Sequence, residues 1–128
     1  MSKKAITSAN APSPIGPYSH ANLATPGQML FVSGQVAKDA KTGELTLTDT
    51  KSETRKIMQN ISAILNEAGM DFSNVVKTTI FLKSMDLFAD VNEVYGSFFK
   101  GDFPARETVA VSGLPLNVNV EISVTAIK

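Results

Sequence analysis

The stretch that decides the fold is residues 118–127, which read VNVEISVTAI. From position 118 to 125, apolar side chains at even positions alternate with polar side chains at odd positions. A period of two is typical of a β-strand with one face against a core and the other face open. The sequence therefore predicts a strand at 118–127 whose apolar face needs to be covered by other elements.

The first element able to cover that face is a helix predicted from Asp49 to about Ala68. Apolar residues recur there at spacings of three and four, which places them on one helical face. Asp49 or Thr50 can cap the start, and Thr50 with Glu53 has the spacing of a capping box. Gly69 follows as the residue that ends the helix in a left-handed conformation.

A second helix is predicted to start near Asp86 and to end before Gly101. Because two amphipathic helices can cover only one face of a sheet, we expect a two-layer α+β domain with a mixed sheet, formed by residues 1–128 as a single unit. The N-terminal segment that holds Pro12, Pro14 and Pro17 can be neither regular helix nor central strand. Runs of apolar and β-branched residues predict three further strands, Met29–Val36, Val75–Leu82 and Ala105–Val111.

Composition excludes several kinds of chemistry. The 128 residues include 12 Lys+Arg, 12 Asp+Glu, one histidine and no cysteine, so the net charge is zero and the basic footprint of a nucleic-acid binder is missing. Thiolate nucleophiles, disulfides and a multi-histidine metal site within one chain are excluded. No apolar run approaches the ~20 residues that span a bilayer, so we expect no membrane partner. Because there is no cysteine to exploit an oxidising compartment, we expect a cytoplasmic protein. Any catalysis must use arginine, carboxylates, hydroxyls and backbone groups.

The polar face of the last strand is left without a covering layer. A mixed face of this kind often docks on copies of itself, so we expect a closed homo-oligomer; the alternative is a monomer with a solvated face. The expected face comprises Asn119, Glu121, Ser123 and Thr125, joined by Arg106, Thr108 and Ala110 if these point the same way.

Two charged residues are the first candidates for chemistry. Arg106 follows Phe103-Pro104-Ala105 at the entrance of a strand, where its guanidinium can bind a carboxylate through two parallel hydrogen bonds. The alternative is a surface arginine or an ion pair with Glu107. Glu121 is the one charge between Val109 and Ile127. On a strand it is either partly desolvated, which suits acid–base work, or simply exposed.

Other candidates carry weaker signals. Tyr18 stands on a stiff loop, where its hydroxyl can bond a ligand or its ring can plug the core. Ser33 and Gly34 interrupt a strand, which indicates either close backbone approach to a ligand or to another chain, or a simple bulge. Asn92 lies beside the buried face of the second helix. His20 is either an acid–base group or incidental.

Six segments, in order along nearly the whole chain, resemble the YjgF/RidA family of enamine and imine deaminases. They are Ile15–Ser19, Phe31–Gln35, Val75–Leu82, Val91–Tyr95, Phe103–Arg106 and Val120–Ile122.

The resemblance implies a chorismate-mutase-like fold, assembled as a homotrimer with a barrel of sheets inside and ligand sites between subunits. It also implies cofactor-free and metal-free hydrolysis of 2-aminoacrylate and 2-iminobutyrate to 2-keto acids and ammonia. The implied partners are therefore small imino and keto acids and further copies of the same chain.

The resemblance also suggests residue roles. Arg106 matches the arginine that holds the substrate carboxylate, and Glu121 matches the carboxylate that positions water. Tyr18, Ser33 with Gly34, and Asn92 match residues that line the site. Thr108 stands where many relatives have cysteine, so it touches the ligand pocket but cannot act as a thiolate. His20 stands where glutamine is common and is a neighbour of the site.

Two other functions are compatible with such a site. One is a regulatory protein that senses 2-keto acids without turning over a substrate; the presence of Arg106 counts against it. The other is a ribonuclease, which the balanced charge and the single histidine disfavour.

Overall fold

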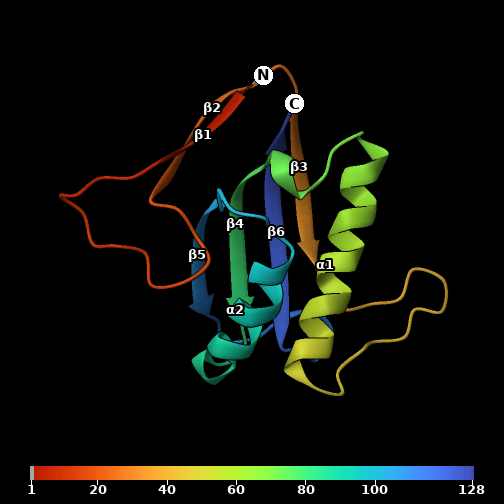
Figure 1. Ribbon diagram of the computed structural model, residues 1–128. Coiled ribbons are helices and arrows are strands. Elements are labelled where there is room, and N and C mark those ends of the chain that lie inside the picture. The colour runs from red at the N-terminus through yellow and green to blue at the C-terminus, as the bar shows by residue number, and fades with distance from the viewer. Residues whose placement is uncertain (1) are drawn as a thin grey trace.

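The computed structural model describes residues 2–128 and contains a four-stranded sheet, two helices and a separate hairpin (Figure 1). Three single turns of 3₁₀ helix, Phe72–Asn74, Met85–Leu87 and Pro115–Asn117, join these elements. The strands and helices are β1 (Ser2–Ile6), β2 (Ala21–Thr25), β3 (Met29–Gln35), α1 (Thr50–Glu67), β4 (Val75–Leu82), α2 (Phe88–Ser97), β5 (Ala105–Ala110) and β6 (Val120–Ile127).

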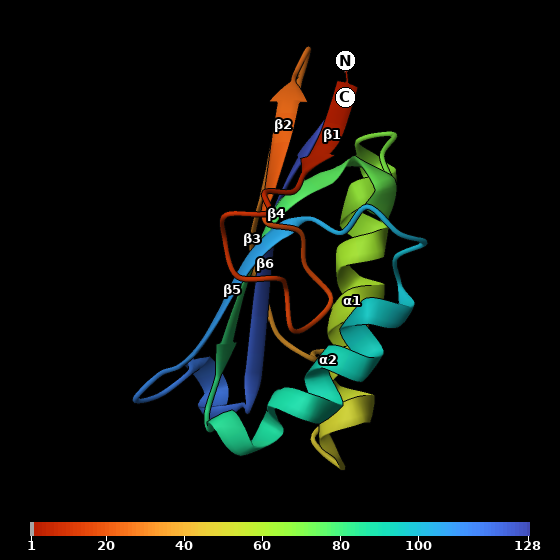
Figure 2. The same cartoon turned by 60° about the vertical axis from the view of Figure 1, so that its left-hand side comes forward.

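The main sheet has the strand order β3-β6-β4-β5. Strands β4 and β5 run parallel, whereas β6 is antiparallel to both of its neighbours. Both helices lie on one face of this sheet, and the other face stays open (Figure 2). The mixed α+β architecture predicted from the sequence is confirmed. Val120, Ile122 and Val124 of β6 point into the core between the layers, as their alternation indicates.

Helix α1 is tied to β6 by a buried carboxylate. Asp49 is the N-cap and accepts a hydrogen bond from the Ser52 amide at 2.8 Å, so the capping box expected at Thr50 and Glu53 is wrong. Glu53 is fully buried and accepts bonds from the backbone amides of Asn119 and Val120, at 2.9 and 3.1 Å. It also accepts a bond at 2.8 Å from the Asn119 side chain, which therefore turns toward α1 and not to the open face as expected.

The helix ends follow from local sequence. Gly69 adopts a φ of 69° directly after α1, and the Met70 amide bonds back to the Leu65 carbonyl at 2.9 Å, which confirms the predicted termination. Helix α2 is shorter than predicted. Residues 85–87 form a 3₁₀ turn before it, and its last residue is Ser97.

The N-terminal part contains two strands that the sequence did not predict. Strands β1 and β2 pair in antiparallel fashion and form a sheet separate from the main one (Figure 1). The proline-containing loop between them is irregular, as expected. Within residues 2–128, no helix is long and apolar enough to cross a membrane.

Candidate functional site

Arg106 occupies a half-buried position on β5, between the sheet and α2. Its Nη1 donates a hydrogen bond to Oδ1 of Asn92 at 2.8 Å. Its Cζ lies 5.4 Å from the ring centroid of Tyr18, 5.8 Å from that of Phe88 and 5.3 Å from that of Tyr95. We call these five residues the Arg106 cluster. Three aromatic faces and one amide therefore surround the guanidinium.

The Arg106 guanidinium has no acidic partner within the described residues. The three ion pairs found there join Lys51 to Glu93, Lys56 to Asp39 and Lys77 to Glu107. Burial lowers the pKa of Arg106 from its ordinary value, yet an arginine side chain stays charged in proteins. A partly desolvated cation that lacks a counter-ion has the properties of a site for an anion, and its planar fork suits a carboxylate.

The loop before β2 forms one wall of the Arg106 cluster. The Tyr18 hydroxyl accepts a hydrogen bond from the Ile15 amide at 3.3 Å, which holds the ring in place. A Cβ built on Gly16 would lie 3.5 Å from Nη2 of Arg106 and 3.5 Å from Nδ2 of Asn92. The absence of a side chain at Gly16 thus keeps the space beside the guanidinium open.

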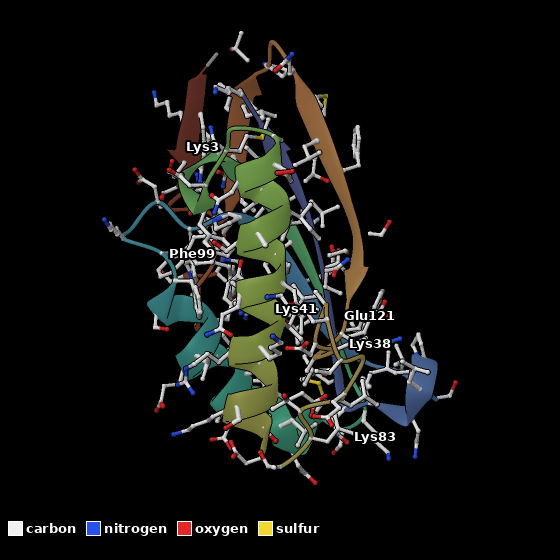
Figure 3. All side chains as sticks on the ribbon, turned by 90° about the vertical axis from the view of Figure 1, so that its right-hand side faces the viewer. Lys3, Lys38, Lys41, Lys83, Phe99 and Glu121 are labelled. Atoms are coloured by element: carbon white, nitrogen blue, oxygen red, sulfur yellow. The ribbon has the colours of Figure 1, made fainter. Side chains whose placement is uncertain are left out.

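Glu121 forms a second cluster with Gly34 on the open face of the sheet. The register of β3 against β6 shifts between Val32 and Gln35, so Ser33 and Gly34 form a bulge. A Cβ on Gly34 would lie 2.7 Å from Cδ of Glu121. The bulge predicted as one alternative is therefore confirmed, and it brings the Gly34 backbone against the carboxylate of Glu121 in the same chain. Figure 3 shows Glu121 near the end of β3.

The Arg106 cluster and the Glu121–Gly34 pair lie on opposite faces of the sheet. Arg106 is level with Thr78 of β4, which is fully buried under the helices. Glu121 is level with Phe81, whose side chain points the other way along the pleat. The expectation that Arg106, Thr108 and Ala110 share the open face with Glu121 is therefore wrong. Glu107 is the β5 charge on that face, where it bonds Thr79 and Lys77.

The remaining candidates have mixed positions. Thr108 lies level with buried Ile80, on the same side of β5 as Arg106, and its buried hydroxyl has no hydrogen-bond partner in the described part of the chain. Ser33 is exposed in the bulge. His20 braces its loop. Its Nδ1 accepts from the Ser8 amide at 3.1 Å and its Nε2 lies 2.5 Å from the Pro12 carbonyl, so both ring nitrogens are engaged.

Sequence reasoning missed Phe88 and Tyr95 as members of the site. Both lie on the buried face of α2, four residues before and three residues after Asn92, so the helical spacing carried a signal.

Among residues 2–128, no group of three or more histidine, aspartate or glutamate side chains is placed to hold a metal ion.

Fold and site together define a class of protein: a small α+β domain with a half-buried arginine that has no acidic partner among residues 2–128. Comparisons identify the family. Residues 8–128 match the family model described as endoribonuclease L-PSP. A RutC family protein of Pyrococcus horikoshii is 48% identical over 98% of both chains.

Two further relatives carry more informative names. The human 2-iminobutanoate/2-iminopropanoate deaminase is 40% identical, over 98% of this chain and 90% of the human one. The crystal structure of the YjgF gene product of E. coli superposes with a TM-score of 0.76 at 39% identity, over 98% of both chains. The protein belongs to the YjgF/Rid family, as the sequence segments indicated.

Proposed function

We propose that this protein hydrolyses reactive 2-imino acids and their enamine tautomers, such as 2-aminoacrylate and 2-iminobutyrate, to 2-keto acids and ammonia. The observation that carries this proposal is the half-buried Arg106 guanidinium, which has no counter-ion in the part of the chain that the structure describes. A carboxylate is the group common to all of these substrates and to their products. The name of the human relative supports the same reaction class.

In this proposal, the Arg106 cluster binds the carboxylate. Asn92 occupies Nη1 and leaves the rest of the guanidinium fork for the ligand. Tyr18 forms a wall of the site, and the hydrogen bond that its hydroxyl accepts from the Ile15 amide holds the ring there. The unpartnered hydroxyl of Thr108, two residues along the strand, lines the pocket on the same side.

The Glu121 carboxylate that acts on this substrate comes from a second copy of the chain. Within one chain, Arg106 and Glu121 lie on opposite faces of the sheet, so one chain does not place both beside a single small molecule. The open face that carries Glu121 also presents Met29, Phe31 and Val109, which are 51%, 71% and 45% exposed. Apolar exposure of this extent is typical of a contact surface. We expect a cytoplasmic homotrimer whose sites, including Ser33 and Gly34, form between subunits.

The chemistry needs only water as co-substrate. An enamine first takes a proton on carbon and loses one from nitrogen, which gives the imine. Water then adds to the imine carbon while Glu121 accepts its proton and returns it to the nitrogen, which gives a carbinolamine. The remaining hydroxyl proton passes to the nitrogen as the carbon–nitrogen bond breaks, so ammonia leaves and the carbonyl of the 2-keto acid forms. Arg106 contributes by fixing the carboxylate next to the attacking water.

The test generates 2-aminoacrylate with a dehydratase and times the release of keto acid. We expect the wild-type protein to accelerate release and Arg106→Ala to lose that acceleration, because several kcal/mol of charge-assisted bonding to the transition state disappear. Arg106→Lys is the matched control; it keeps the charge but not the fork, and should retain part of the activity.

Two results would contradict the proposal. One is a wild-type protein that gives no acceleration, and the other is an Arg106→Ala variant as active as the wild type. Binding of 2-ketobutyrate in calorimetry without any imine hydrolysis would favour the regulatory alternative.

A further inference from the structure

Tyr95 and Thr78 form a hydrogen bond between fully buried hydroxyls. Tyr95 lies on α2 and Thr78 on β4, and the Tyr95 hydroxyl donates to Oγ1 of Thr78 at 2.8 Å. A phenylalanine packed against a valine would fill the same space without taking two hydroxyls out of water. Packing alone therefore does not explain why two hydroxyl-bearing side chains are buried at this position.

The position of the Tyr95 ring supplies that reason. The ring centroid lies 5.3 Å from Cζ of Arg106, within the range of a cation–π contact. Thr78 is the register partner of Arg106 across the parallel pair β4–β5. The hydroxyl that anchors the ring thus belongs to the residue beside the arginine. Phe99 packs on the ring as well, at 4.9 Å between centroids.

We propose that Tyr95, anchored by Thr78, is a positioning residue that sets the orientation of the Arg106 guanidinium for carboxylate binding. This inference rests on the carboxylate site of the proposed function. An arginine is usually oriented by an acidic partner, but such a partner here would neutralise the guanidinium and compete with the substrate. The hydrogen bond to Asn92 holds one nitrogen, and a single contact of this kind leaves the plane of the guanidinium free to tilt. An aromatic face fixes that plane and leaves the fork charged and open.

The hydroxyl stays a neutral donor at physiological pH. Burial raises the pKa of Tyr95 to about 12, against the opposing hydrogen bond to Thr78. The anchor is therefore not released by ordinary changes in pH.

Calorimetry with 2-ketobutyrate as the probe tests the inference directly, alongside kcat and KM for imine hydrolysis. Tyr95→Leu removes the aromatic face and should weaken binding about tenfold. KM should rise by a larger factor than that by which kcat falls. Tyr95→Phe and Thr78→Val each free the ring and should weaken binding a few-fold. The double variant Tyr95→Phe with Thr78→Val should be no weaker than either single variant, because both remove the same bond.

Phe98→Leu is the matched control for general loss of packing. Phe98 belongs to the neighbouring aromatic cluster, where it packs against Phe72 at 5.5 Å, and is not among the rings around Arg106. This variant should lower the melting temperature and leave the affinity and KM unchanged.

Two outcomes would overturn the inference. The first is wild-type affinity in Tyr95→Leu or, if that variant does not fold, wild-type affinity in both Tyr95→Phe and Thr78→Val. The second is an equal loss of affinity in Phe98→Leu. A wild-type protein that binds no 2-keto acid would contradict the proposed function and this inference together, whereas normal binding in the Tyr95 variants contradicts the inference alone.

Discussion

The Arg106 cluster and the Glu121–Gly34 pair lie on the two faces of one sheet. They differ in how much of their surroundings a single chain supplies. The Arg106 cluster is enclosed by the loop before β2, by α2 and by β5, and its side chains contact one another within one chain. Glu121 stands on a face that neither α1 nor α2 covers, among exposed apolar side chains. Under the proposed function, the first region binds the carboxylate by itself, whereas the second needs another copy of the chain to form a site.

This difference separates binding from chemistry within the proposed mechanism. Arg106 holds the carboxylate and is itself positioned by contacts within its own chain. Glu121 of the neighbouring chain accepts the proton of the attacking water. Variants on the two faces should therefore change different kinetic constants, and variants that weaken the contact between copies should act like a loss of Glu121.

The largest expected effect on the open face comes from Glu121→Gln. The amide keeps the shape of the side chain but cannot accept a proton from water, so kcat should fall by about 10²–10⁴-fold. The affinity for 2-ketobutyrate should stay close to the wild-type value, because Arg106 is untouched. A parallel loss of affinity would show that the two faces do not divide binding and chemistry in this way.

The next largest effect is expected from Phe31→Asp. Phe31 is 71% exposed on β3, and a charge there would have to be desolvated in any contact between copies. Sedimentation should show a smaller assembly, with imine hydrolysis reduced by about 100-fold. Leu47→Asp, at a 38% exposed position in the connection before α1, is the control and should change neither property. A monomer that still hydrolyses imines would contradict the claim that Glu121 must come from a second copy of the chain.

Gly34→Ala should have a smaller effect. The added methyl group would meet the Glu121 carboxylate, and Gly34 does not occupy a left-handed backbone conformation, so the carboxylate moves while the backbone tolerates the change. We expect kcat to fall by roughly tenfold, the cost of misplacing a reacting group. Gly113→Ala provides the control, since a Cβ at Gly113 meets no atom within 4 Å. Equal activities of the two variants would argue against a role for Glu121 in the reaction.

The smallest effect is expected from Tyr18→Phe. The ring beside Arg106 remains, and only the bond between the hydroxyl and the Ile15 amide is lost. KM should rise by about two- to fivefold, in line with one neutral hydrogen bond. A rise of 100-fold would instead assign the Tyr18 hydroxyl a direct bond to the substrate carboxylate.

The sequence predicted those parts of the molecule whose local pattern has a single interpretation. The alternation in residues 118–125 correctly predicted Glu121 on the open face, although Asn119 of the same pattern turns toward α1, and the helical period predicted the buried side of α2. No comparable pattern indicated which side chains of β5 face the helices and which face the open side. Arg106 and Glu107 are adjacent, so a strand must turn one charge toward the helices and the other away, and composition does not say which.

Two other features were decided by tertiary contacts. Glu53 has the spacing of a capping residue, but it is buried where it can accept three hydrogen bonds from Asn119 and Val120. Strands β1 and β2 are five residues each and pair mainly with one another, so neither carries a strong pattern of its own.

Subunit mixing tests the central claim most directly, namely that Arg106 of one copy and Glu121 of another form each site. Arg106→Ala and Glu121→Gln chains, each inactive alone, are unfolded together in equal amounts and refolded. If sites form between copies, random assembly creates intact pairs, and imine hydrolysis should return to about one quarter of the wild-type level. If both residues act from the same chain, every site lacks one of them, and a mixture that stays inactive would contradict the account.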